Sequence, residues 1–327
     1  MSDIEVRRDD FRATRVVGGS GEGNVRIEKF ALTANNVTYA VLGDAFRYWQ
    51  FFPASEDGWG RVPVWGLGTV LETGETIYGY FPMSSAVTMR LDDNLIERSE
   101  HRADLPPTYN RYMRMPPDTP HLDETLLLRP LFGTSFLLED LLRGAEGTVL
   151  LGSASSKTAY GLAFLLSRGG QRVAGLTSAR NREFVESLGI YDRVLSYEEV
   201  DALRGEPVVF VDMAGDGRVR DAVHEAADVR RSVVVGATHW EQLGAGSGEA
   251  QGELFFAPDH IERMTKELGG AELRRRMGEA WDAFAERVGD FMEIEHGEGP
   301  EDVQRVWRSL VDGEADPRRG HVLTLYG

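Results

Sequence analysis

The sequence predicts an α/β fold, in which a doubly wound parallel sheet is joined to a second, irregular domain rich in strands. In the second half of the chain, stretches of helical periodicity alternate with continuous apolar runs such as Val149–Leu151, Val208–Val211 and Val233–Val235. Strands that are apolar on both faces and separated by helices are typical of a parallel sheet that helices cover on both sides. Residues 25–83 instead show short alternating runs between turn residues, which indicates an irregular β-domain.

Changes in these patterns mark the expected domain limits. The β-rich pattern ends near residue 125, and the helical periodicity of the second part ends near residue 288. Residues 321–325 form a last strand-like run, which suggests that the chain returns to its first domain. We therefore predict a β-rich substrate and catalytic domain at 1–125, a nucleotide-binding domain at 126–288 and a returning tail at 289–327.

The charge and the cysteine count exclude several classes of protein. The 327 residues include 36 basic and 53 acidic side chains, and the resulting net charge of −17 disfavours nucleic acids and anionic membranes as partners. The absence of cysteine excludes disulfides, cysteine-ligated zinc and thiol catalysis. No apolar run reaches the ~18 residues of a membrane span, and the N-terminus lacks the apolar core of a signal peptide. We expect a cytoplasmic protein.

Aromatic residues are concentrated in the first domain, with Tyr39, Tyr48, Trp65 and Tyr80 among them. We expect most of these rings to form a core, and the functional alternative is that a subset lines an apolar pocket. The proline-rich stretch 98–122 is expected to run over the surface.

Residues 147–163 predict an anion-binding turn. A short apolar strand, Val149–Leu151, is followed by small residues from Gly152 to Ala159 and then by apolar positions at helical spacing. Small residues let the backbone N–H groups of a helix N-terminus approach an anion, and the helix dipole favours negative charge there. This is how a Rossmann-type domain holds the pyrophosphate of a dinucleotide, although the glycine fingerprint G-x-G-x-x-G is absent here.

The end of the next predicted strand favours NADP(H) over NAD(H). An acid at this place accepts hydrogen bonds from the ribose hydroxyls of NAD(H), but the chain has Thr177, Ser178 and Arg180 instead. Hydroxyl groups and a guanidinium are the donors that a 2′-phosphate needs. The alternative is that Ser178 only caps a helix and that Arg180 and Arg182 are solvated.

A nucleoside triphosphatase is a rival from another class. Gly152–Thr158 also resembles a phosphate-binding P-loop, and Asp212 followed by Gly215 resembles a metal-binding strand end. A P-loop needs a glycine before its lysine, but Ser156 stands there and the loop is one residue short.

The predicted NADP site draws on the ends of the predicted sheet strands. The histidines are scattered without a metal-binding spacing, so no metal site is predicted. The predicted cofactor-binding residues are Ser153, Ala154, Ser155, Ser156, Lys157, Thr158, Thr177, Ser178, Arg180, Asn181, Tyr197, Asp212 and Gly236.

Several stretches carry a family resemblance. Ala34–Thr38 is similar to an early active-site strand, and Pro63–Glu72 is similar to the motif P-G-x-E-x-x-G-x-V. Gly147–Ala163 is similar to V-L-V-x-G-A-A-G-G-V-G, and Gly320–Leu325 is similar to G-K-x-V-L. Glu183–Gly189, followed by Tyr197, is similar to the stretch that leads to a cofactor-contacting tyrosine. In these stretches the chain resembles the medium-chain dehydrogenase/reductase superfamily, in its zinc-free, quinone-oxidoreductase-like branch. Together with Asn35-Asn36 and Trp65-Gly66, the pattern looks closest to a little-characterised family long filed as a domain of unknown function.

The resemblance implies a GroES-like first domain and an NADP(H)-dependent, metal-independent reductase. Hydride would pass to an activated C=C or C=O bond of an apolar small molecule of the quinone or enone type. Without a metal, hydrogen-bond donors must stabilise the developing oxyanion and supply a proton. The candidate catalytic donors are Asn36, Tyr39, Tyr48 and Thr134. The family has a tyrosine in this region, and either Tyr39 or Tyr48 could correspond to it.

One further alternative function stays open at this point. The same fold could serve a nucleotide-binding sensor or accessory protein without turnover. A small-molecule substrate is the expected partner, and a homodimer is left open.

Overall fold

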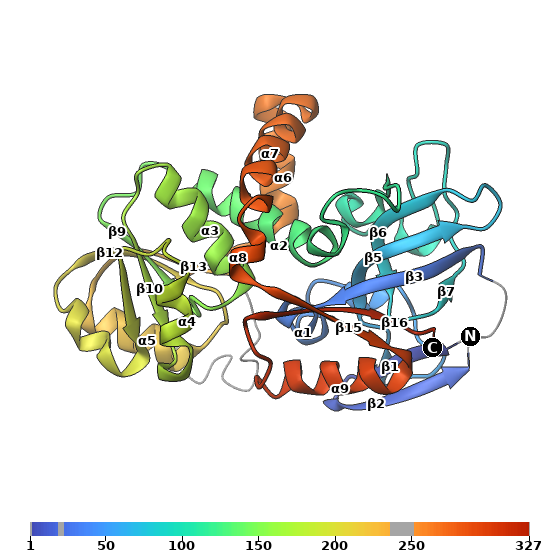
Figure 1. Cartoon of the computed structure of the whole chain (residues 1–327), viewed down its shortest axis with the longest axis horizontal. Coiled ribbons are helices and arrows are strands. Elements are labelled where there is room, and N and C mark those ends of the chain that lie inside the picture. Colours follow the sequence, from blue (N-terminus) through green and yellow to red (C-terminus); the bar gives the residue numbers. More distant parts are fainter. Residues whose placement is uncertain (1, 19–22, 236–251, 327) are drawn as a thin grey trace. The chain divides into compact units, whose positions relative to one another are not determined.

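The computed structural model describes residues 2–18, 23–235 and 252–326, which form two compact units (Figure 1). Unit 1 comprises Met1–Leu127 and Glu293–Gly327, and unit 2 comprises Leu128–Met292.

Unit 2 is built on a six-stranded parallel sheet, with strand order β11-β10-β9-β12-β13-β14. From β9 the chain moves outward through β10 to β11, then returns to the other side of β9 and continues outward from β12. With right-handed crossovers, this reversal places helices on both faces of the sheet, and ligands bind at the carboxyl ends of the strands near the reversal. The predicted doubly wound, Rossmann-type sheet is therefore confirmed. Its strands are β9 (Thr148–Gly152), β10 (Val173–Thr177), β11 (Arg193–Ser196), β12 (Pro207–Asp212), β13 (Asp228–Val234) and β14 (Glu253–Leu254).

Aromatic packing joins the helices of unit 2. The ring of Phe284 stacks on Phe132 at a centroid distance of 4.8 Å and also contacts Tyr160 and Phe164. The helical pattern after residue 257 is divided by Gly269, whose φ of 80° ends one helix before the next begins. The helices are α2 (Leu122–Leu141), α3 (Lys157–Arg168), α4 (Arg182–Ser187), α5 (Gly217–Ala226), α6 (Ala257–Leu268), α7 (Gly270–Ala285) and α8 (Val288–Phe291).

Unit 1 contains the predicted β-rich structure, in two sheets. A seven-stranded sheet has the order β15-β16-β3-β5-β6-β8, with β7 paired to β3, and a three-stranded sheet has the order β2-β1-β4. The tail strand β16 pairs antiparallel with β3, and helix α9 (Gly299–Val311) connects β15 to β16. The strands are β1 (Ser2–Arg7), β2 (Asp10–Gly18), β3 (Val25–Leu32), β4 (Trp59–Gly60), β5 (Pro63–Val70), β6 (Thr76–Pro82), β7 (Ala86–Val87), β8 (Met113–Arg114), β15 (Glu293–Glu298) and β16 (Arg319–Thr324).

The stretch Ala34–Thr38 is helical, and its expected similarity to a strand is wrong. It begins helix α1 (Ala34–Val41), because Thr33 and Asn36 form a capping box. The Oδ1 atom of Asn36 accepts the Thr33 backbone N–H at 2.8 Å, which satisfies a donor that the first turn leaves open.

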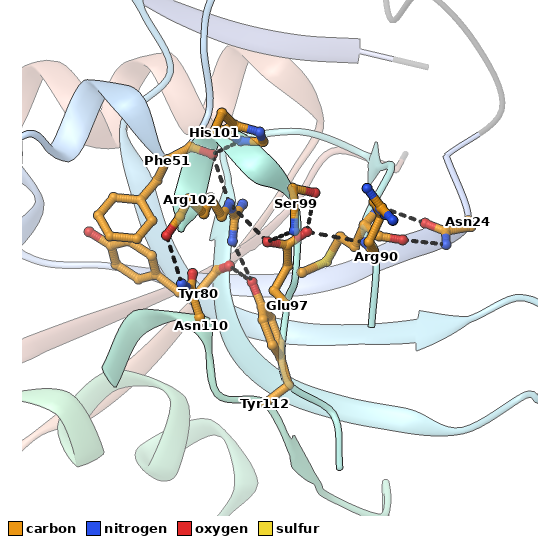
Figure 2. Close-up of polar contacts among 11 residues, drawn as sticks. Asn24, Phe51, Tyr80, Arg90, Glu97, Ser99, His101, Arg102, Asn110 and Tyr112 are labelled. Carbon is orange, nitrogen blue, oxygen red and sulfur yellow. Dashed lines mark hydrogen bonds and ion pairs between the residues drawn. The ribbon is translucent and has the colours of Figure 1, made fainter. Parts of the chain in front are cut away.

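The proline-rich stretch 98–122 runs over the surface for most of its length, as expected, but Arg102 of the stretch anchors it in a buried ion pair. Arg102 and Glu97 are both buried, with 3.7 Å between Arg102 Nε and Glu97 Oε2. Arg102 also donates to the Phe51 carbonyl at 3.1 Å, and Tyr112 donates its hydroxyl to the Tyr80 carbonyl (Figure 2). Together these contacts bury Tyr109 and Tyr112 of the stretch against the strands.

We expect Arg102→Leu to lower the free energy of unfolding by about 3 kcal/mol, because it leaves the Glu97 carboxylate buried without its cation. Arg98→Leu is the matched control, since Arg98 is exposed and its pair with Asp92 lies at the surface. The control should cost less than about 1 kcal/mol. Urea unfolding followed by circular dichroism measures both, and equal losses would contradict the role given to Arg102.

Candidate functional site

The turn after β9 has a glycine-like backbone although a serine occupies it. Ser153 has φ of 49°, in the left-handed region that glycine adopts without strain. Its hydroxyl lies 3.3 Å from the Tyr197 hydroxyl, in the 3₁₀ helix after β11. Burial is the main cause that raises the pKa of Tyr197, so its phenol stays protonated. The serine that replaces a glycine therefore keeps the turn geometry and gains a side-chain contact.

Backbone and side-chain contacts fasten this turn to the sheet. The Ala154 N–H donates to the Leu176 carbonyl at 3.0 Å, and Tyr191 donates its hydroxyl to the Ala154 carbonyl at 2.9 Å. Gly175 permits the close approach, because a Cβ there would lie 2.9 Å from the Cβ of Ala154. The sequence analysis missed Tyr191, although a glycine inside a strand signals a close approach of this kind.

The remaining serines of the turn organise the start of α3. Ser156 is the N-cap, and its Oγ accepts the Ala159 N–H at 3.3 Å. The Oγ atom of Ser155 accepts a hydrogen bond from Asn181 Nδ2 at 3.2 Å, which connects the turn to the end of β10. Each hydroxyl that accepts in this way still has its own O–H to donate to an anion. Lys157 and Thr158, both half-buried, begin the helix, and the Thr158 carbonyl accepts the Ser135 hydroxyl.

The end of β10 presents an unsatisfied donor. Thr177 is buried in the sheet, and the buried Oγ of Ser178 has no hydrogen-bond partner among the described residues. Ser178 stands at the N-cap of a 3₁₀ turn, but its side chain makes no capping hydrogen bond. Arg180 follows two residues later and is exposed, and Arg182 pairs with Glu186 and Glu199. Ser178 therefore does not cap this 3₁₀ turn in the structure, and the end of β10 carries a buried hydroxyl and, two residues further on, an exposed guanidinium.

Asp212, at the end of β12, is committed to contacts within the protein. Its Oδ1 atom accepts the N–H groups of Ala214 and Gly215 at 3.1 and 2.8 Å, and its Oδ2 atom pairs with buried Arg220 at 3.0 Å. Burial raises its pKa, although these hydrogen bonds and the guanidinium lower it. The sequence analysis missed Arg220. Gly236, the last predicted cofactor contact, lies outside the described residues.

The candidate proton donors lie in both units. In unit 1 the amide of Asn36 makes structural contacts, since Nδ2 donates to the Pro63 carbonyl at 2.9 Å and Oδ1 serves the capping box. The Tyr39 hydroxyl accepts from Trp65 Nε1 at 3.1 Å, and the Tyr48 hydroxyl lies 3.3 Å from that of Tyr109. In unit 2 Thr134 is half-buried on α2, and its hydroxyl lies 3.4 Å from the Pro130 carbonyl.

A tyrosine cluster, formed by Tyr39, Tyr48, Tyr80 and Tyr109, brings aromatic rings and hydroxyl groups together inside unit 1. The ring of Tyr80 stacks on Tyr109 at 4.6 Å, and the rings of Tyr39 and Tyr48 are 4.7 Å apart. Burial raises the pKa of all four phenols. The buried Tyr80 hydroxyl has no hydrogen-bond partner within the described residues. Sequence reasoning placed Tyr80 among the core aromatic residues but missed Tyr109, because the stretch that holds Tyr109 was expected at the surface.

The described residues contain neither a cluster of metal ligands nor a helix that could cross a membrane. No three His, Cys, Asp or Glu side chains within residues 2–18, 23–235 and 252–326 are placed to hold a metal ion. In the same ranges no helix combines the length and the apolar composition that crossing a membrane requires.

The family of the chain follows from a sequence comparison. A family model described as a protein of unknown function, DUF2855, matches residues 30–316. The chain belongs to this family. The expected link to a little-characterised family is thereby confirmed, while none of the curated proteins matches the DUF2855 chain.

Solved structures show that this member of DUF2855 shares its fold with oxidoreductases. CurA from Vibrio vulnificus in complex with NADPH has a TM-score of 0.66 at 13% identity, with both chains fully covered. CurK enoyl reductase has a TM-score of 0.59 at 14% identity, covering 99% of this chain and 98% of that one. The yhdH oxidoreductase from Salmonella enterica in complex with NADP has a TM-score of 0.52 at 13% identity, with 99% of each chain covered. These similarities establish the fold.

We expect Gly175→Ala to destabilise unit 2 by about 1–3 kcal/mol, because its Cβ would press on Ala154 and on the ring of Tyr191. Gly133→Ala is the control, since a Cβ at this helical position would meet no atom within 4 Å. The control should be neutral or stabilising by about 0.5–1 kcal/mol. Thermal unfolding of both variants measures the difference, and a harmless Gly175→Ala would show that the turn does not depend on this approach.

The backbone of Ser153 is tested by comparing two variants that both lack its hydroxyl. Only Ser153→Ala keeps a Cβ at positive φ, so we expect Ser153→Gly to be the more stable of the two by about 1 kcal/mol. Chemical unfolding at equilibrium gives this difference directly. An alanine variant as stable as the glycine variant would mean that the turn adopts another backbone conformation.

Proposed function

We propose that unit 2 binds NADP(H) and that the protein is an NADP(H)-dependent reductase. The observation that carries this proposal is the end of β10, where Ser178 keeps a buried hydroxyl without a described partner and Arg180 is exposed. No acid stands there to accept hydrogen bonds from the ribose of NAD(H). A 2′-phosphate would satisfy the Ser178 donor and pair with the guanidinium.

The other residues of the site fit the rest of the cofactor. The turn Ser153–Ser156 and the first N–H groups of α3 would hold the pyrophosphate, with serine O–H groups adding donors. When bound, NADPH would supply hydride. Support comes from proteins of the same fold whose structures contain the cofactor, namely Vibrio vulnificus CurA and mycobacterial Rv1454c with NADPH and Salmonella enterica yhdH with NADP.

We further propose that the substrate is an apolar quinone or enone, reduced at an activated C=C or C=O bond. The tyrosine cluster of unit 1 offers aromatic surfaces for such a molecule and hydroxyl donors for the oxygen that becomes negative. The proposed reaction needs no metal, because these donors take the place of a Lewis acid. One protein of the same fold is an enoyl reductase, which agrees with this substrate class.

Alternative functions differ in what they require of the same residues. A nucleoside triphosphatase would need Asp212 as a metal-binding acid, but both of its oxygens are occupied by N–H groups and by Arg220. A sensor or accessory protein would bind NADP(H) without turnover. A homodimer and a cytoplasmic location stay predictions.

The cofactor preference is tested by titrating the protein with NADPH, NADH and Mg-ATP. We expect NADPH to bind more tightly than NADH, and we expect Arg180→Glu to weaken NADPH about tenfold to hundredfold while changing NADH little. Arg182→Gln is the matched control, because Arg182 is already paired with two glutamates. Binding of Mg-ATP alone would reject the proposal.

Turnover then separates a reductase from a sensor. NADPH oxidation is followed at 340 nm against a panel of quinones and enones. Tight NADPH binding without oxidation in any member of the panel would favour the sensor.

A further inference from the structure

Asn181 connects the end of β10 to the turn after β9 through both its backbone and its side chain. Its backbone N–H donates to the Ser178 carbonyl at 2.9 Å, which closes a turn at the end of β10. Its side-chain Nδ2 atom donates to the Oγ atom of Ser155 at 3.2 Å, across 26 positions of the chain. One residue of unit 2 therefore links two segments that the proposed function assigns to different phosphate groups of the cofactor.

The side chain of Asn181 makes this contact in place of the one that its position favours. Asn181 is the N-cap of α4, and asparagine is among the preferred N-cap residues because its side-chain oxygen can accept N–H groups of the first turn. Within the described part of the chain, its side chain makes no capping hydrogen bond. The amide of Asn181 is thus directed to the turn after β9 and not to its own helix.

The direction of the hydrogen bond determines what the Ser155 hydroxyl can do. The amide NH₂ group of Asn181 is the donor, so the Ser155 oxygen accepts and its own O–H is left to donate elsewhere. Both residues are half-buried, and Ser155 directly precedes Ser156, the N-cap of α3. The helix dipole and the first N–H groups of α3 favour an anion at this place, and such an anion would accept the Ser155 proton.

We propose that Asn181 is a positioning residue that acts through Ser155 on the pyrophosphate of the dinucleotide, and not on its 2′-phosphate. This inference rests on the proposed binding of NADP(H) by unit 2. By donating to the Ser155 oxygen, the Asn181 amide directs the Ser155 O–H to a pyrophosphate oxygen. Arg180, the preceding residue, serves the 2′-phosphate, so two consecutive residues act on different phosphate groups. The rival is the direct contact with the cofactor that the sequence analysis predicts for Asn181.

Ligands that carry only one of the two phosphate groups test the proposal. The pyrophosphate is common to NADPH, NADH and ADP-ribose, whereas 2′-AMP carries the 2′-phosphate without a pyrophosphate. We expect Asn181→Ala to weaken NADPH, NADH and ADP-ribose alike, by about threefold to fivefold, and to leave 2′-AMP unchanged. Nicotinamide fluorescence gives the affinities for NADPH and NADH, and displacement of NADPH gives those for the two fragments.

Two other variants serve as references for this pattern. Arg180→Glu should show the opposite selectivity, with losses for NADPH and 2′-AMP and little change for NADH and ADP-ribose. Asn94→Ala is the matched control, because Asn94 is an exposed asparagine of unit 1 and should change none of the four affinities. A loss confined to NADPH and 2′-AMP in Asn181→Ala would overturn the proposal and support the direct contact.

A double-mutant cycle shows whether Asn181 acts through Ser155. Ser155→Ala removes the donor itself, so we expect it to weaken NADPH by about tenfold or more, which exceeds the loss in Asn181→Ala. In the Ser155→Ala background, Asn181→Ala should cause no further loss. Additive losses would overturn the proposal. Equal losses in the two single variants would also overturn it, because the contact would then only hold the turn in place.

The ratio of the affinities for ADP-ribose and 2′-AMP is a readout that a general loss of structure would not move, because partial unfolding weakens both ligands together. Failure of this inference alone leaves the unaltered protein binding NADPH more tightly than NADH. Absent binding of NADPH to the unaltered protein would reject the cofactor proposal itself.

Discussion

The hydrogen bond from the Ala154 N–H to the Leu176 carbonyl fixes the turn after β9 to the end of β10. Its geometry depends on Gly175, which gives the turn room, and on Tyr191, which holds the Ala154 carbonyl from the other side. Because of this constraint, the turn before α3 is held beside the end of β10, as the proposed cofactor site requires. The pyrophosphate and the 2′-phosphate of a dinucleotide need these two features together.

The features that depend on local pattern could be predicted from the sequence. Continuous apolar runs identified β9, β12 and β13 of unit 2, and the end of the next predicted strand drew attention to Ser178, because both follow from neighbours in the chain. The short strand β14 was not predicted. Helix α1 was not predicted as a helix, since its start depends on hydrogen bonds between Thr33 and Asn36 rather than on periodicity. The course of residues 98–122 depends on a buried ion pair and on distant carbonyl groups, which no local pattern reports.

The serines of the turn show how one backbone can be kept by different side chains. Glycine is favoured in such turns because it tolerates positive φ and leaves room for an anion. Ser153 adopts the same φ region, and its neighbours use their hydroxyls to cap α3 and to contact Asn181. A site that is ordered before its ligand arrives loses less conformational entropy on binding. The absence of the glycine fingerprint is therefore compatible with a phosphate-binding turn.

The division of the chain has a consequence for biosynthesis. Unit 2 is one uninterrupted segment, whereas unit 1 is completed only by the residues after Met292. During translation, β3 has no partner on the side of β16 until this last segment leaves the ribosome, and an unpaired strand edge can join another chain. A nascent chain can complete the nucleotide domain first, and the final residues then close the sheet that carries the tyrosines.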